Sequence, residues 1–193
     1  HPGLPKCATS SIQRSFVVRN HALARQLGVQ FLGREFQPDN GYPEVIRLID
    51  DPQACAADVQ TTEYTAGRYF LSNEALSGKR EFIAVLRSKF EIEKAVFTIR
   101  LPALQAISQY CFSGWISASF DEAAEHPATS FVNAQARHKM KLSEFKMLGV
   151  PTQLCPLESD GEHIVTRFCR IAFETPVEIP DGLEEPHVNR SIG

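Results

Sequence analysis

Residues 152–173 read TQLCPLESDGEHIVTRFCRIAF, and the prediction of the fold depends mainly on this stretch. Its middle part, 158–162 (ESDGE), contains Asp160-Gly161, a dipeptide typical of tight turns. Apolar residues dominate on both sides, so residues 152–157 and 163–173 are predicted to form the two strands of a β-hairpin. Both alternating sets of positions in the second strand hold large apolar residues, which indicates a strand covered on both faces: Ile164/Phe168 and Val165/Cys169/Ile171/Phe173.

The rest of the chain shows helical and strand patterns in mixed order. Residues 95–101 (AVFTIRL) are rich in β-branched and aromatic residues and predict a strand. Residues 64–71 fit either a strand or a loop. Apolar spacing and capping residues predict helices at 12–27, at 52–59 after Asp51, at 73–93 and at 127–148, and one further strand at 45–49. A fifth helix is predicted to start at Pro102, and its buried stripe consists of Leu104, Ile107, Cys111 and Trp115. No regular strand–helix–strand alternation is evident. We therefore expect an α+β fold with helices on a small, largely antiparallel sheet and a C-terminal β-hairpin.

The length of 193 residues is that of one domain. Residues 1–10 and 180–193 are rich in Pro, Gly and polar side chains. We expect a loose N-terminal segment at 1–10, a single α+β domain at 11–179 and a loose, acidic C-terminal tail at 180–193.

The composition is typical of a globular protein, because 43% of the residues are hydrophobic and 22% are charged, which excludes disorder of the whole chain. No stretch has the roughly 18 uninterrupted apolar residues of a membrane-spanning helix, so we expect no integral membrane association. The five cysteines are widely spaced without a C-x-x-C pair. They are expected to be buried thiols in a reducing compartment, which favours a cytoplasmic location.

The helix expected at 127–148 carries the clearest cluster of basic residues. Residue types that contact phosphates or base edges gather at 133–146, and the candidate nucleic-acid-binding residues are Asn133, Arg137, Lys139 and Lys141. The chain as a whole is acidic, with a net charge of −3 and a pI near 6.1, whereas nucleic-acid-binding domains are usually basic. A solvated helix face or a protein partner explains the same residues.

A Cys–His pair is the alternative that involves catalysis. In the expected hairpin, Cys155 at a strand end and His163 across the turn come near each other, as a thiol nucleophile and its base would. The histidines show no metal-binding spacing and no phosphate-binding glycine loop occurs, so no metal or cofactor is predicted.

The phenylalanines favour binding over catalysis. Most of the 13 fit the periods of helices and strands, but five fit poorly and would form a partner or ligand surface if exposed together: Phe31, Phe36, Phe70, Phe112 and Phe120. We therefore expect a non-enzymatic binding or regulatory protein that acts through a surface. Its partner would be another protein, a second copy or a larger assembly, with nucleic acid as a further candidate through the 133–146 helix. The alternative is a small hydrolase or transferase that uses Cys155 and His163.

Overall fold

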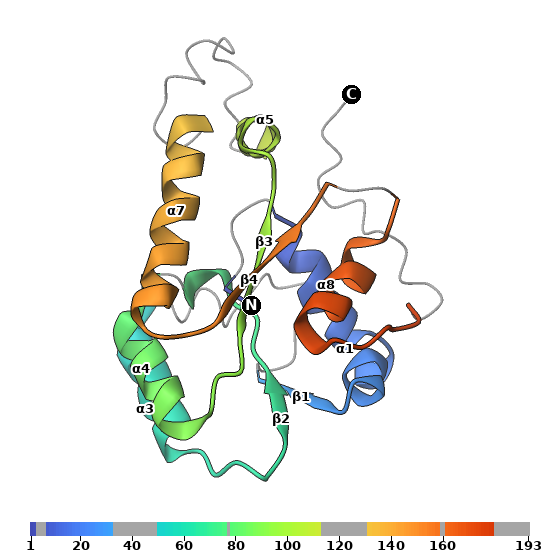
Figure 1. Ribbon diagram of the computed structural model, residues 1–193. Coiled ribbons are helices and arrows are strands. Elements are labelled where there is room, and N and C mark those ends of the chain that lie inside the picture. Colours follow the sequence, from blue (N-terminus) through green and yellow to red (C-terminus); the bar gives the residue numbers. More distant parts are fainter. Residues whose placement is uncertain (3–6, 33–49, 77, 113–130, 159–160, 180–193) are drawn as a thin grey trace.

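The chain folds into three layers, with helices on both sides of two short parallel sheets (Figure 1). The computed structural model describes residues 1–2, 7–32, 50–76, 78–112, 131–158 and 161–179. Helices α1 (Thr9–Gln26) and α8 (Ile164–Phe173) lie on one side of the strands. Helices α3 (Pro52–Thr61), α4 (Arg80–Lys89) and α7 (Phe131–Met147) lie on the other, and α5 (Pro102–Phe112) lies at one end.

The strands form two separate parallel pairs. Strand β1 (Val29–Phe31) pairs with β2 (Arg68–Phe70), and β3 (Ala95–Ile99) pairs with β4 (Thr152–Pro156). Helices connect the strands within each pair, as a parallel arrangement requires. The largely antiparallel sheet expected from the sequence is therefore wrong for the described residues, in which both sheets are parallel.

The predicted C-terminal β-hairpin is also wrong, because residues 164–173 form helix α8. Ile164, Val165, Phe168, Cys169 and Ala172 are all buried, and their spacing places them on one side of a helix. Apolar residues at both odd and even positions, which suggested a strand covered on both faces, fit this helical spacing equally well. His163 begins the helix, since its Nδ1 accepts a hydrogen bond of 3.2 Å from the backbone N–H of Val165.

Several predicted elements are confirmed, namely the helix at 12–27, the capped helix after Asp51 and the strands at 95–101 and 152–157. The Asp51 carboxylate accepts a hydrogen bond of 2.9 Å from the N–H of Ala54. The helix expected at 73–93 is a 3-10 turn, η1 (Glu74–Leu76), followed by α4, and Gly78 between them has a φ of +86°. The strand expected at 45–49 lies outside the described residues.

The burial expected for the apolar stripe of α5 is wrong at the two positions whose side chains are described. Leu104 and Ile107 are exposed, whereas Gln105 and Ser108 are buried. The side chains of Cys111 and Trp115 lie outside the described residues.

Two hydrophobic cores pack on opposite faces of the strands. The α1–α8 core contains apolar residues of α1, β1, β2 and α8, and the α4–α7 core contains those of η1, α4, β3 and α7. Strand β3 belongs to both, because Val96 packs in the α1–α8 core while Ala95 and Phe97 pack in the α4–α7 core. The two cores therefore lie on the two faces of one layer of strands.

Two further expectations concern the chain ends and the phenylalanines. His1, Pro2 and Cys7 are buried, while residues 3–6 and 180–193 lie outside the described residues, and the expected division into segments at 1–10, 11–179 and 180–193 stays a prediction. Phe70 is buried, and Phe31 is half-buried against it with ring centroids 5.8 Å apart. These two do not form an exposed surface, and the other three side chains lie outside the described residues: Phe36, Phe112 and Phe120.

Candidate functional site

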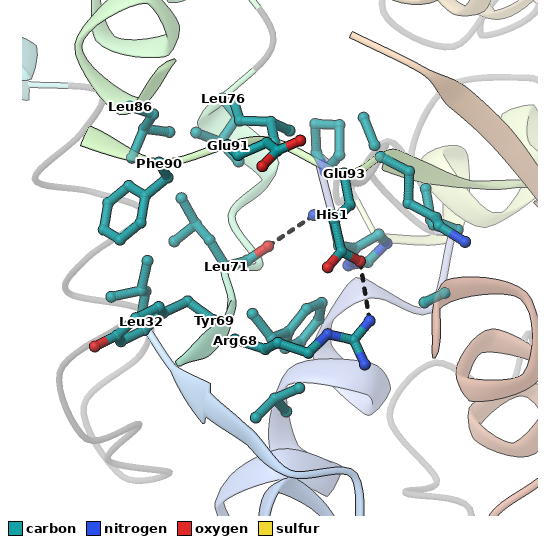
Figure 2. Close-up of a pocket in the computed structure, with 18 of the residues that line it drawn as sticks. His1, Leu32, Arg68, Tyr69, Leu71, Leu76, Leu86, Phe90, Glu91 and Glu93 are labelled. Atoms are coloured by element: carbon teal, nitrogen blue, oxygen red, sulfur yellow. Dashed lines mark hydrogen bonds and ion pairs between the residues drawn. The ribbon is translucent and has the colours of Figure 1, made fainter. Parts of the chain in front are cut away.

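The two sheets do not join into one, and a pocket of about 680 Å³ lies between β2 and β3. Both cores contribute to its walls. The side chains that line it are mainly apolar or aromatic and include Leu71, Leu76, Leu86 and Phe90 (Figure 2). Ligand pockets typically have about 300–1,000 Å³ and walls of this kind, so the gap is a candidate ligand site.

Strand β2 directs its side chains to both faces of the layer and so shapes the pocket. Phe70 packs into the α1–α8 core, with its ring 4.3 Å from that of Phe16. Tyr69 points to the opposite face, where Tyr64, Tyr69 and Phe90 form an aromatic trio with centroid distances of 4.7–5.8 Å. This trio connects β2 to the end of α4 and closes one side of the pocket.

Charged side chains line the pocket's outer edge and pair with one another. Arg68 on β2 and Glu93 before β3 form an exposed ion pair of 2.9 Å (Figure 2). Lys94 and Glu174 form a second ion pair of 2.6 Å, which joins the start of β3 to the end of α8. The hydrogen bond from Lys94 lowers the pKa of the exposed Glu174 carboxyl. These pairs connect β2 to the segment before β3, and that segment to the end of α8.

His1 lies at the inner end of the pocket and bridges the two sheets. Its backbone nitrogen donates a hydrogen bond of 2.7 Å to the carbonyl of Leu71, and its own carbonyl accepts one of 3.1 Å from the N–H of Asn73. Its ring nitrogens contact the hydroxyls of Ser72 and Thr98, at 2.8 and 3.1 Å. A single residue therefore spans the distance from the edge of β2 to β3.

The four candidate nucleic-acid-binding residues all belong to α7, but they do not share one side of it. Positions 133, 137 and 141 follow one another at intervals of four, whereas position 139 lies about 160° around the axis from 137, because each residue adds about 100°. Lys139 is exposed and Lys141 half-buried, while the side chains of Asn133 and Arg137 lie outside the described residues. Nucleic-acid binding by these residues stays a prediction, which retention on heparin tests.

The structure gives Cys155 and His163 environments that differ from those of a nucleophile and its base. Cys155 is completely buried on β4, and this burial raises the pKa of its thiol to about 11. His163 uses Nδ1 to cap α8, and its Nε2 has no hydrogen-bond partner among the described residues. An activated thiolate needs a lowered pKa and solvent access, so the geometry offers this pair no support.

Sequence reasoning missed the pocket, although its residues carried a weak signal. The segment 64–71 fitted either a strand or a loop, because β2 has only three residues, too few for a clear alternation. Gly67, which has no side chain, comes directly before Arg68, Tyr69 and Phe70. This glycine is the one local indication that a strand starts here. The ion pair between Arg68 and Glu93 joins residues 25 positions apart, which no local pattern indicates.

The described part of the chain has neither a metal site nor a membrane span that would indicate a function. Within the described ranges, no three His, Cys, Asp or Glu side chains gather in a way that could hold a metal ion. No helix of the described residues is both long and apolar enough to cross a membrane. The chain matches no protein-family model, no curated protein and no solved structure, so any functional assignment rests on the geometry described above.

Proposed function

We propose that this is a binding protein whose ligand occupies the pocket between β2 and β3. The observation that carries the proposal is the pocket itself, about 680 Å³ in volume and lined from both cores by apolar side chains. The sequence favoured binding through a surface, and the pocket supports binding in a different place, inside the layer of strands.

The distribution of polar groups supports binding rather than catalysis. At the outer edge, Arg68 pairs with Glu93 and Lys94 pairs with Glu174, so these charges stabilise one another. At the inner end, the hydroxyls of Ser72 and Thr98 contact the His1 ring. The walls between these two ends are mainly hydrophobic, which suits retention of an apolar ligand.

The fluorescent probe 1-anilinonaphthalene-8-sulfonate, which binds apolar surface, tests the proposal on the folded protein. Ala66 is exposed and lines the opening of the pocket, so the variant Ala66→Trp narrows the opening without altering a core. We expect probe binding to weaken at least about fivefold, which corresponds to losing about 1 kcal/mol of apolar burial. A fluorescence titration measures it.

The matched control is Ala84→Trp, which introduces the same side chain at an exposed position of α4 that does not line the pocket. Its titration should coincide with that of the unmodified protein. Equal probe binding by both variants and the unmodified protein would show that the probe binds elsewhere, and the proposal would be wrong.

A further inference from the structure

A second hollow lies on the side of the strands where α3, α4 and α7 pack (Figure 1). It is an open groove of about 820 Å³, and no described residue lines both this groove and the pocket between β2 and β3. Its lining residues on α3 include Gln53, Ala56 and Gln60, and those on α7 include Met140 and Met147. Spacings of three, four and seven residues place each set on one face of its helix. The groove thus has two helix faces as walls, and the start of α4 contributes to it as well.

The α7 wall of the groove is apolar and exposed. Met140 and Met147 are 65% and 69% exposed, and they lie two turns apart, about 10.5 Å along the helix axis. Single exposed apolar side chains are ordinary, but two on one helix face beside a groove are typical of an interaction site. Methionine also adapts its shape to a partner. On the α3 wall, Ala56 and Ala57 are small, so a partner can approach that helix closely.

The buried carboxylate that lines the groove already has its partners. Glu144 accepts a hydrogen bond of 2.8 Å from the N–H of Gly78 and pairs with Arg80 at 3.4 Å. The Arg80 side chain is 65% exposed, so it also meets solvent at the groove. Among the described lining residues, Glu81 is the one exposed acidic side chain, and those of α3 are all uncharged. The lining therefore holds little negative charge that is open to a partner.

Two lysines of α7 give the groove a positive border. Lys139 and Lys146 are both exposed, and each directly precedes one of the two methionines. Because each residue adds about 100° around a helix, both lysines lie about 100° to the same side of the methionine face. A partner that contacts Met140 and Met147 therefore has one flank beside two positive charges, which favours acidic residues on that flank.

We propose that the groove binds an amphipathic helix of another protein, with apolar residues against Met140 and Met147 and acidic residues along the flank beside Lys139 and Lys146. A helix pairs its own backbone groups, whereas an extended segment needs an open strand edge, which the helix faces of α3 and α7 do not offer. Each wall spans about two turns, so a helix of about three turns is long enough to cover it. The inference is independent of the proposed function, because it concerns a different site and a different class of partner.

A synthetic peptide tests the inference on the full chain. The probe is fluorescein-Ala-Glu-Leu-Gln-Ala-Glu-Leu-Gln-Glu-Leu-Gln-Ala-Glu-Leu-amide, whose leucines recur at helical spacing and whose glutamates all lie on one flank of the leucine stripe. We expect saturable binding by fluorescence anisotropy at low salt. A matched peptide with lysine in place of every glutamate should bind at least about tenfold more weakly, because it brings like charges to Lys139 and Lys146.

Two pairs of variants locate the peptide in the groove. Ala57→Trp fills the groove from an exposed position and should weaken binding at least about fivefold, whereas Ala84→Trp, exposed on α4 and outside the groove, should not change it. Lys146→Glu should weaken binding of the glutamate peptide at least about threefold and strengthen binding of the lysine peptide. Its matched control is Lys89→Glu, because Lys89 is also an exposed lysine in the last turn of a helix but lies at the end of α4 away from the groove.

Sedimentation velocity on the same samples distinguishes the possible occupants. Binding of the glutamate peptide to a monomeric chain, weakened by Ala57→Trp and reversed in its charge preference by Lys146→Glu, supports the inference. Self-association of the chain that Ala57→Trp abolishes would show that a second copy fills the groove, and it would overturn the inference. Failure of both peptides to bind, equal binding of the two, or binding that Ala57→Trp leaves unchanged also overturns it.

Discussion

At the scale of single residues, burial decides the chemistry of the thiols. Cys7, Cys155 and Cys169 are completely buried, and desolvation raises their pKa values to about 12, 11 and 12. Cys55 on α3 is only half-buried. Since the thiolate is the reactive form, a pKa of about 11 leaves only about one part in a thousand ionised at pH 8.

We therefore expect iodoacetamide at pH 8 to modify Cys55 first among these four cysteines, and the three buried thiols only after unfolding in urea. Peptide mapping by mass spectrometry measures the order. Fast labelling of Cys155 in the folded protein at pH 6 would contradict the burial described here and would restore the hypothesis of a Cys155–His163 catalytic pair.

At the scale of elements, one buried arginine holds the loop after β4 against α8. The Arg167 guanidinium donates to the carbonyls of Pro156 and Glu162, at 2.5 and 2.8 Å, and pairs with the Glu162 carboxylate at 3.2 Å. The variant Arg167→Met should lower the free energy of unfolding by about 2–4 kcal/mol, because it removes the buried guanidinium that donates charge-assisted hydrogen bonds to both carbonyls and to the Glu162 carboxylate. Urea denaturation measures the loss.

The matched control is Arg170→Met, one turn further along the same helix. Arg170 contacts the same Glu162 carboxylate at 2.8 Å but is exposed, so its removal should change the free energy of unfolding by less than about 1 kcal/mol. The hydrogen bond from Arg170 lowers the pKa of Glu162, so the stability from this contact is present above the ordinary glutamate pKa and falls as the pH decreases below it. Equal losses in the two variants would contradict the role given to Arg167.

Individual elements differ in how well the sequence predicts them. Helix α1, the Asp51 cap and strand β3 follow from local spacing, because each has a long apolar period or a specific capping residue. Residues 164–173 were assigned wrongly, since their apolar residues satisfy a doubly buried strand and an amphipathic helix alike. Only the packing of Phe168 and Cys169 in the α1–α8 core distinguishes the two.

The candidate site could not be predicted from local pattern. The pocket exists because β2 and β3 face each other without pairing, and pairing between strands more than 20 residues apart leaves no periodic trace in the sequence. The parallel pairing also escaped prediction, because β1 and β2 have three residues each and the spacing of α5 and α7 does not by itself show that they connect β3 to β4 as a crossover.

At the scale of the whole molecule, β3 connects the two cores. Alternate residues of this strand enter opposite cores, with Val96 on one side and Phe97 on the other, and the ion pair between Lys94 and Glu174 joins its start to α8. Disturbing one core should therefore destabilise the other, although they lie on different faces of the strands. Such coupled stability of the two cores is what a single domain at 11–179, as expected from the sequence, would show.

The variant Phe97→Ala tests this coupling, because Phe97 is completely buried in the α4–α7 core against Phe145, with ring centroids 5.1 Å apart. The cavity should lower the free energy of unfolding by about 3–5 kcal/mol. If the molecule unfolds as one unit, the slowest-exchanging amides of α8, which packs only in the other core, should exchange faster by the same factor as those of α4. Hydrogen exchange measured by mass spectrometry compares the two helices. Faster exchange confined to α4 would mean that the two faces unfold separately and that β3 does not transmit stability between them.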